Sequence, residues 1–130
     1  MGTAKIQGEL WGAAPQEWAE LQEPLHAPLY AAMLNATSVR QGTRLVDVGC
    51  GGGAASVLAA ERGAQVSGLD AAAGLLAFAR QHVPSGDFRV GDMESLPFAD
   101  SAFDVVFAAS SLQFAGNPPA ALGEFGRVCV

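Results

Sequence analysis

The sequence predicts an α/β fold in which a parallel sheet carries flanking helices. Three observations lead to this prediction. Short apolar segments alternate with helical segments after residue 43, a glycine-rich loop joins the first predicted strand to the helix that follows, and an aspartate ends the second strand. Alternation of strands and helices at this spacing is typical of parallel sheets with helical crossovers. The length of 130 residues accommodates one domain of this kind.

The individual elements follow from hydrophobic periodicity and from the positions of glycine and proline. Strands are predicted at residues 44–48, 64–69, 87–90 and 104–109, and helices at residues 54–62, 71–82 and 118–127. Upstream, Trp18, Leu21, Leu25 and Leu29 recur at the three-to-four spacing of a helix. Proline interrupts helices, so Pro24 and Pro28 divide residues 16–35 into two short helices. Residues 1–15 are expected to be irregular.

Composition limits the partners and the compartment. The formal net charge is −6 and the arginines are scattered, so no nucleic-acid partner is expected, because phosphate backbones require basic patches. A small neutral or cationic substrate suits this charge. Cys50 and Cys129 have neither metal-ligand nor disulfide-framework spacing. Without a signal peptide or a spanning apolar segment, the sequence predicts a cytoplasmic protein with no membrane contact.

The strongest motif is the glycine loop VDVGCGGG, residues 46–53. It follows a predicted strand and opens a predicted helix, which is the context in which such loops bind ligands. A Cβ at Gly49 or Gly51 would hinder either the sharp turn or the close approach of a ligand. The free N–H groups of the helix that follows Gly53 are expected to face a carboxylate or phosphate. The alternative is a glycine-rich turn that binds nothing.

Asp70 ends the second predicted strand, 21 residues after Gly49. A carboxylate at this position accepts hydrogen bonds from ribose hydroxyls in dinucleotide-binding sheets. The alternative is an ordinary helix cap, since a helix is predicted to begin at residue 71. Gly49, Gly51 and Ala54 also fit the G-x-G-x-x-A fingerprint, so this half of the chain leaves an NAD(P) or flavin site open.

The segment GDMESLPFADSAFDVVFAASSLQF, residues 91–114, separates these possibilities. Together with VDVGCGGG and SGLD, it resembles the class I S-adenosylmethionine-dependent methyltransferases, in particular the bacterial type that methylates small molecules. The family pattern LPF-x-D-x-x-FD is present as Leu96, Pro97, Phe98, Asp100, Phe103 and Asp104. The resemblance covers about residues 40–130. It implies a Rossmann-like fold, S-adenosylmethionine as cofactor, S-adenosylhomocysteine as product and a small-molecule methyl acceptor.

The resemblance also implies which residues bind the cofactor: Asp47, Gly49, Cys50, Gly51, Gly53, Asp70, Asp92, Met93 and Ala109. Gly49 to Gly51 would face the methionyl part, and Asp47 would hold its ammonium. Asp92 would accept the adenine amino group, with Met93 packed on the ring. The alternatives are that Asp92 caps a turn and that Met93 is plain core. No catalytic residue and no metal site is predicted.

The resemblance further divides the chain into an N-terminal helical lid, residues 1–38, and the cofactor-binding core, residues 39–130. Trp11, Trp18 and Tyr30 would then wall the substrate, or else pack between helices. His26 is a candidate base, although packing or solvation is the simpler interpretation.

The sequence departs from the family pattern at its end. The family continues beyond the position of Val130 with three more strands, so the sheet is expected to be truncated after the fourth strand, in the order 3-2-1-4. We expect a second copy of the chain, or a further C-terminal segment, to cover the exposed edge. A remnant that binds cofactor without turnover is the alternative.

Overall fold

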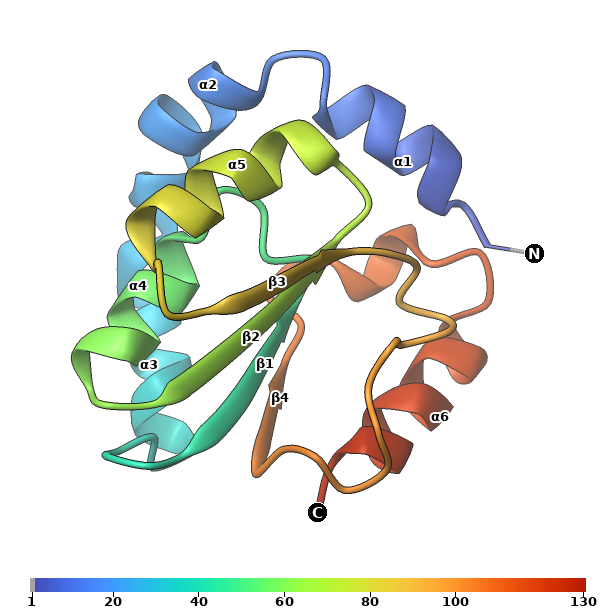
Figure 1. Cartoon of the computed structure of the whole chain (residues 1–130). Helices are drawn as coiled ribbons and strands as arrows, with labels where there is room; N and C mark the ends of the chain where they lie inside the picture. The colour runs from blue at the N-terminus through green and yellow to red at the C-terminus, as the bar shows by residue number, and fades with distance from the viewer. Residues whose placement is uncertain (1) are drawn as a thin grey trace.

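The computed structural model describes residues 2–130 and contains a four-stranded parallel sheet. The strands are β1 (Arg44–Val48), β2 (Gln65–Asp70), β3 (Asp87–Val90) and β4 (Val105–Phe107). Their order across the sheet is β3-β2-β1-β4, as predicted (Figure 1). The fold class is therefore confirmed, with a fourth strand shorter than the predicted 104–109.

The central strand β1 is buried on both faces. Leu45 belongs to the cluster beneath one face of the sheet, whereas Val46 and Val48 belong to the cluster beneath the other. All three side chains are fully buried. Side chains alternate along a strand, so a strand covered on both faces has a nearly continuous apolar sequence. At the four buried positions of RLVDV, Asp47 alone breaks this rule, which makes that aspartate a candidate for a special role.

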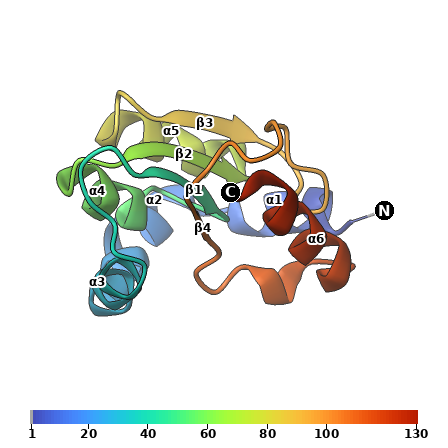
Figure 2. The same ribbon diagram turned by 90° about the horizontal axis from the view of Figure 1, so that it is seen from below.

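Helices cover both faces of the sheet (Figures 1 and 2). One face packs against α3 (Ala27–Ala36), α4 (Ala54–Glu61) and α5 (Ala73–His82). The other face packs against α6 (Pro118–Val128). Figure 2 shows α3 and α6 separated by the strands. This arrangement leaves the carboxyl ends of the strands free to form a binding site.

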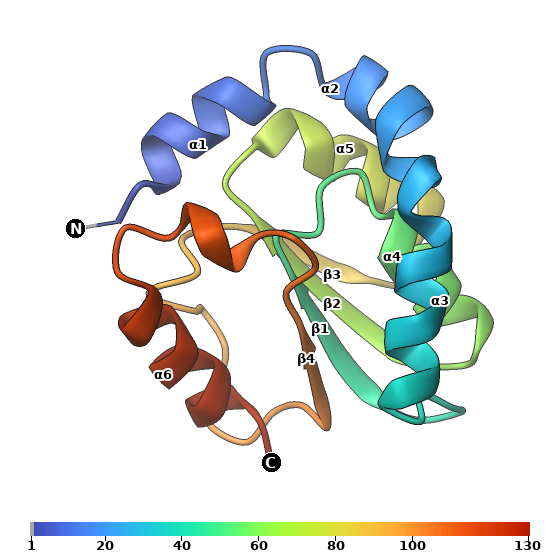
Figure 3. The same ribbon diagram turned by 180° about the vertical axis from the view of Figure 1, so that it is seen from behind.

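The N-terminal segment contains more helix than predicted. It begins with α1 (Ala4–Trp11), so the expectation of irregular structure up to residue 15 is wrong. A short α2 (Pro15–Glu17), a π-helical turn η1 (Trp18–Gln22) and a 3-10 turn η2 (Glu23–His26) then lead into α3. Pro24 and Pro28 each stand in the first turn of a new helical piece, where the missing N–H costs nothing. Figure 3 shows α1 and α2 passing over one end of the molecule.

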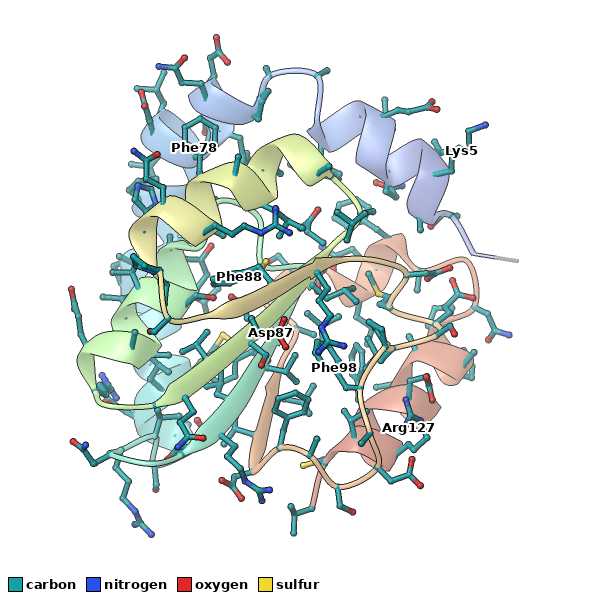
Figure 4. The ribbon with its side chains drawn as sticks, in the orientation of Figure 1. Lys5, Phe78, Asp87, Phe88, Phe98 and Arg127 are labelled. Atoms are coloured by element: carbon teal, nitrogen blue, oxygen red, sulfur yellow. The ribbon has the colours of Figure 1, made fainter. Side chains whose placement is uncertain are left out.

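The segment that carries the LPF motif is tied to α6 by one arginine. The Arg127 guanidinium pairs with Glu124 and Asp100 and donates to the carbonyl oxygens of Leu96 and Phe98. Phe98 and Arg127 lie on the α6 side of the sheet (Figure 4). This part of the LPF motif therefore maintains the fold rather than lining a site.

Among residues 2–130, no helix has the length and apolar character needed to cross a membrane.

Candidate functional site

A cavity of about 280 Å³ lies at the carboxyl ends of the strands. Open parallel sheets bind their ligands at this end. The cavity brings together residues that follow each of the four strands: Gly49, Asp70, Gly91, Asp92, Met93, Ala109 and Ser110. Five of the nine residues predicted to bind cofactor line the cavity. The other four, Asp47, Cys50, Gly51 and Gly53, lie behind or beside the glycine loop.

Aromatic side chains from the N-terminal segment form one side of the cavity. The Trp11 ring meets the Trp18 ring edge-on at 4.7 Å between centroids and the Phe114 ring at 5.6 Å. The His26 ring has its centroid 6.3 Å from that of Trp18 and 6.2 Å from that of Tyr30. All five side chains line the cavity. Trp11, Trp18 and Tyr30 thus line the cavity, as one alternative predicts, and the two tryptophans also pack against each other, as the other alternative predicts.

The glycine loop has the backbone that only glycine adopts freely. Gly49, Gly51 and Gly53 have φ values of 78°, 56° and 92°. A Cβ on Gly49 would collide with the Cβ of Ser111, whose hydroxyl donates to the Val48 carbonyl at 2.8 Å. The loop therefore depends on glycine both for its conformation and for contact with the segment after β4.

Every backbone N–H from Gly49 to Ala54 has an acceptor within the chain. Gly49 and Cys50 donate to the Leu69 carbonyl, and Gly53 donates to the Cys50 carbonyl. The other three donate to carboxylates: Gly51 to Asp70 at 2.9 Å, and Gly52 and Ala54 to Glu23, each at 2.8 Å. The expectation that these N–H groups face a ligand therefore needs correction, because Glu23 already caps this helix end.

Asp70 joins three parts of the site. One carboxylate oxygen accepts the Gly51 N–H and the other accepts the Ala72 N–H at 2.8 Å, just before α5. The helix-cap alternative is thus partly right, although Ala72 and not Asp70 stands at the cap position. Each oxygen keeps a second lone pair, and the side chain lines the cavity. Asp70 can therefore hold the loop and still accept hydrogen bonds from hydroxyl groups.

Asp92 lines the cavity after β3, and Met93 lines it while also packing on the core beneath the α6 face. One oxygen of Asp92 accepts the Glu94 N–H at 2.9 Å, which is the turn-capping contact of the alternative interpretation. The other oxygen lies so close to Gly2 that a Cβ there would collide with it. The start of the chain is thus packed against the Asp92 carboxylate.

Asp47 and Cys50 are buried behind the loop. Asp47 is 2% exposed and accepts the Ser56 hydroxyl at 3.1 Å. Burial raises the pKa of Asp47 to about 7, and the negative charges of Glu23 and Asp70 add to the rise. The Cys50 thiol belongs to the apolar core, and burial raises its pKa well above the usual value. Cys50 is therefore inert packing rather than a nucleophile.

Two contacts of the glycine loop were missed by sequence reasoning. Glu23 is 3% exposed, although charged residues are seldom buried. His82, at the end of α5, has its Nδ1 3.2 Å from the Gly52 carbonyl oxygen. Neither residue has a local sequence signal, because its partner lies about thirty residues away along the chain.

The charge of the cavity is negative. Among the described residues that line it, the side chains that carry formal charge are all carboxylates: Glu23, Asp70, Asp92 and Glu94. Burial raises the pKa of both Glu23 and Asp70, while backbone N–H groups oppose the rise. A cationic ligand would relieve the repulsion among these groups. The site is thus suited to a molecule that carries hydroxyls, an amine and a positive charge.

Gly53→Ala is expected to lower the free energy of unfolding by about 2–3 kcal/mol, since φ is left-handed at this position. In addition, the new Cβ would lie 2.9 Å from the Cα of Ala79 in α5. Gly123→Ala in α6 is the matched control, because nothing lies within 4 Å of its Cβ position. The control is expected to be neutral or more stable by about 0.5–1 kcal/mol. Urea unfolding of both variants measures the difference, and equal midpoints would contradict the prediction.

A glycine loop and successive carboxylates at the ends of a parallel sheet define a nucleoside-cofactor fold of the Rossmann-like class. A family model described as a methyltransferase domain matches residues 46–130. The chain belongs to this family. It is also 40% identical over 96 residues to a malonyl-[acyl-carrier protein] O-methyltransferase of Serratia marcescens, covering 74% of this chain and 38% of that protein.

Other comparisons agree on the fold. An uncharacterised protein of Mycobacterium tuberculosis is 30% identical over 130 residues, covering 97% of this chain and 47% of its own length. The crystal structure of the [4+2]-cyclase SpnF superposes with a TM-score of 0.73 at 32% identity, over 79% of this chain and 40% of that one. A methyltransferase from Aquifex aeolicus shares the fold with a TM-score of 0.76 at 20% identity, over 88% and 66%. The chain spans less than half the length of the curated relatives named here.

Proposed function

We propose that this chain forms the S-adenosylmethionine-binding part of an enzyme that methylates a small molecule. The observation that supports this proposal best is the pair Asp70 and Asp92, which line one cavity beside Gly49 at the ends of neighbouring strands. Carboxylates are the acceptors that ribose hydroxyls and an adenine amino group require. The charged side chains of the lining are all carboxylates, which adds a match to a sulfonium cation.

The residues of the chain would share the binding as follows. Asp70 accepts the ribose hydroxyls, Asp92 accepts the adenine amino group, and Met93 packs on the adenine ring. Gly49 allows close approach of the methionyl part, and Ala109 lies beside the sulfur. When bound, S-adenosylmethionine supplies a methyl group on positively charged sulfur, which a nucleophilic acceptor atom attacks in line. Positioning and exclusion of water can supply much of the rate for such a transfer.

Residues 1–38 would act as the lid of this site. Thr3, which precedes α1, and Gln7 and Trp11 within it line the cavity together with Trp18 and Tyr30. These side chains shield the cavity from water and offer a flat, mostly apolar surface to the acceptor. The Serratia relative is named for a malonyl group on an acyl-carrier protein. For the present chain we propose only the coarser class, a small-molecule acceptor.

Titration calorimetry of the purified chain with S-adenosylmethionine, S-adenosylhomocysteine and NADH tests the proposal. We expect micromolar binding of the two sulfur ligands and none of NADH, because the carboxylates that line the cavity suit the ammonium of the sulfur ligands and repel the pyrophosphate of NADH. Binding of NADH alone would overturn the proposal in favour of a dinucleotide site. Since one fold supports several reactions, methyl transfer is then followed with labelled cofactor and candidate acceptors.

A further inference from the structure

The glycine loop is held by a carboxylate that arrives from the N-terminal lid. Glu23 comes from the 3-10 turn η2, 29 residues before Gly52. Its two oxygens accept separate N–H groups at the start of α4, one from Gly52 and one from Ala54. A carboxylate that accepts two backbone N–H groups at a helix N-terminus is stabilised by both the hydrogen bonds and the helix dipole.

The loop is shaped to receive this side chain. A Cβ on Gly51 would lie 3.1 Å from Oε2 of Glu23, and one on Gly52 would lie 3.0 Å from the same atom. A Cβ on Gly52 would also collide with Ala19 of the lid, 2.6 Å away. Glycine at these positions thus leaves room for the lid.

The same lid segment carries side chains that line the cavity. Trp18 precedes Glu23 by five residues, and Tyr30 follows it by seven. Tyr30 is 8% exposed, and within the described chain its hydroxyl makes no hydrogen bond to the protein. Glu23 is the polar contact through which this segment is fastened to the loop. Losing that contact would unfasten this lid segment from the start of α4.

Charge gives Glu23 a second effect. Its negative charge lies at the positive end of the α4 dipole. This helix end therefore presents a carboxylate to the cavity instead of free N–H groups. The carboxylate of Asp70 is bound to the adjacent N–H, that of Gly51. Two neighbouring carboxylates favour an ammonium group and disfavour another carboxylate.

We propose that Glu23 is a positioning residue, which fastens the lid to the glycine loop and orients the methionyl end of the cofactor with its ammonium toward the start of α4. This inference rests on the proposed function. Glu23 acts through the loop and through its charge, and it takes no part in the transfer itself.

The test compares Glu23→Ala and Glu23→Gln with a control, Glu20→Gln. Glu20 is an exposed glutamate of the same segment, and its side chain accepts from Gln16. Affinity is measured by calorimetry for S-adenosylmethionine and for adenosine, which lacks the methionyl end. We expect S-adenosylmethionine to bind roughly 30-fold more weakly to the Ala variant and roughly 10-fold more weakly to the Gln variant, since charged hydrogen bonds are lost. Adenosine affinity should change less than about twofold in every variant.

The outcomes are distinguishable. Equal losses for S-adenosylmethionine and adenosine would show that Glu23 merely maintains the fold, and unchanged affinity for both would show that it positions nothing; either result overturns the inference. The Gln variant keeps one acceptor oxygen, so it remains informative if the Ala variant does not fold. Failure of the proposed function would show itself in the unaltered chain, as absence of S-adenosylmethionine binding, before any variant is compared.

Discussion

Asp70→Asn is expected to weaken S-adenosylmethionine binding by roughly 100-fold, because it removes one of two acceptor oxygens and a charge-assisted hydrogen bond to the ribose is worth about 1.5–3 kcal/mol. The carboxylate accepts the Gly51 and Ala72 N–H groups with different oxygens and still has lone pairs to offer. The amide of asparagine keeps one of these oxygens and turns an N–H toward a backbone donor. Calorimetric titration of the variant and the unaltered chain measures the loss.

Two controls separate the ribose contact from a general loss of structure. Asp87→Asn alters an exposed carboxylate of β3 whose partner is Arg89, at 2.8 Å, and should leave affinity unchanged. The unaltered chain should also prefer adenosine to 2′,3′-dideoxyadenosine, whereas Asp70→Asn should bind the two about equally. A variant that still discriminates between these nucleosides would place the ribose elsewhere.

The fold could be predicted because its signals are local. The strands at 44–48 and 87–90 agree with the structure, since turn residues bound each of these short segments of strand-forming and apolar residues. The glycine loop and Asp70 have fixed positions relative to those strands, so the residues gathered at the cavity followed from topology. Asp92 and Met93 came from the family resemblance, and the structure places both at the same cavity.

The N-terminal segment, residues 2–38, could not be predicted to the same degree. Helix α1 contains no buried residue, and its Ile6 and Leu10 are 60% and 65% exposed. The helix therefore has no buried apolar stripe from which it could be predicted. Glu23 stands between Gln22 and Pro24 and has the local pattern of a solvated charge. Its burial is a consequence of tertiary contact with a loop that lies far along the chain. Such long-range polar pairs carry no periodicity that a single sequence reveals.

Asp47 is expected to make the chain less stable as the pH rises from about 4 to about 7. Burial raises the pKa of Asp47 in the folded chain from 3.8 to about 7, whereas the unfolded chain keeps the ordinary value. Between these values the folded state binds the extra proton, so the free energy of unfolding falls with pH and levels off above about 7. A shift of about 3 pH units corresponds to at most about 4 kcal/mol.

Asp47→Asn isolates this effect. Asparagine resembles the protonated acid and can still accept the Ser56 hydroxyl, so the variant should gain stability over the unaltered chain progressively between pH 4 and 7. Glu23 and Asp70 also have raised pKa values and contribute a slope of the same sign to both proteins, which cancels in the difference. Urea unfolding at several pH values measures this difference in the free energy of unfolding.

Asp104→Asn is the contrasting control. Its hydrogen bond to Arg44 lowers the pKa of Asp104 to about 2, so its contribution is lost only as the pH falls below about 4. A stability difference for Asp47→Asn that does not change between pH 4 and 7 would contradict the raised pKa of Asp47.

The Asp47→Asn variant should lose affinity for S-adenosylmethionine even though it gains stability. If Asp47 supports the methionyl ammonium, directly or through water, Asp47→Asn will bind S-adenosylmethionine more weakly while it unfolds less readily above pH 7. A buried carboxylate that lowers stability is expected to persist where binding depends on its charge. Stability gained without any loss of affinity would instead identify Asp47 as a purely structural partner of Ser56.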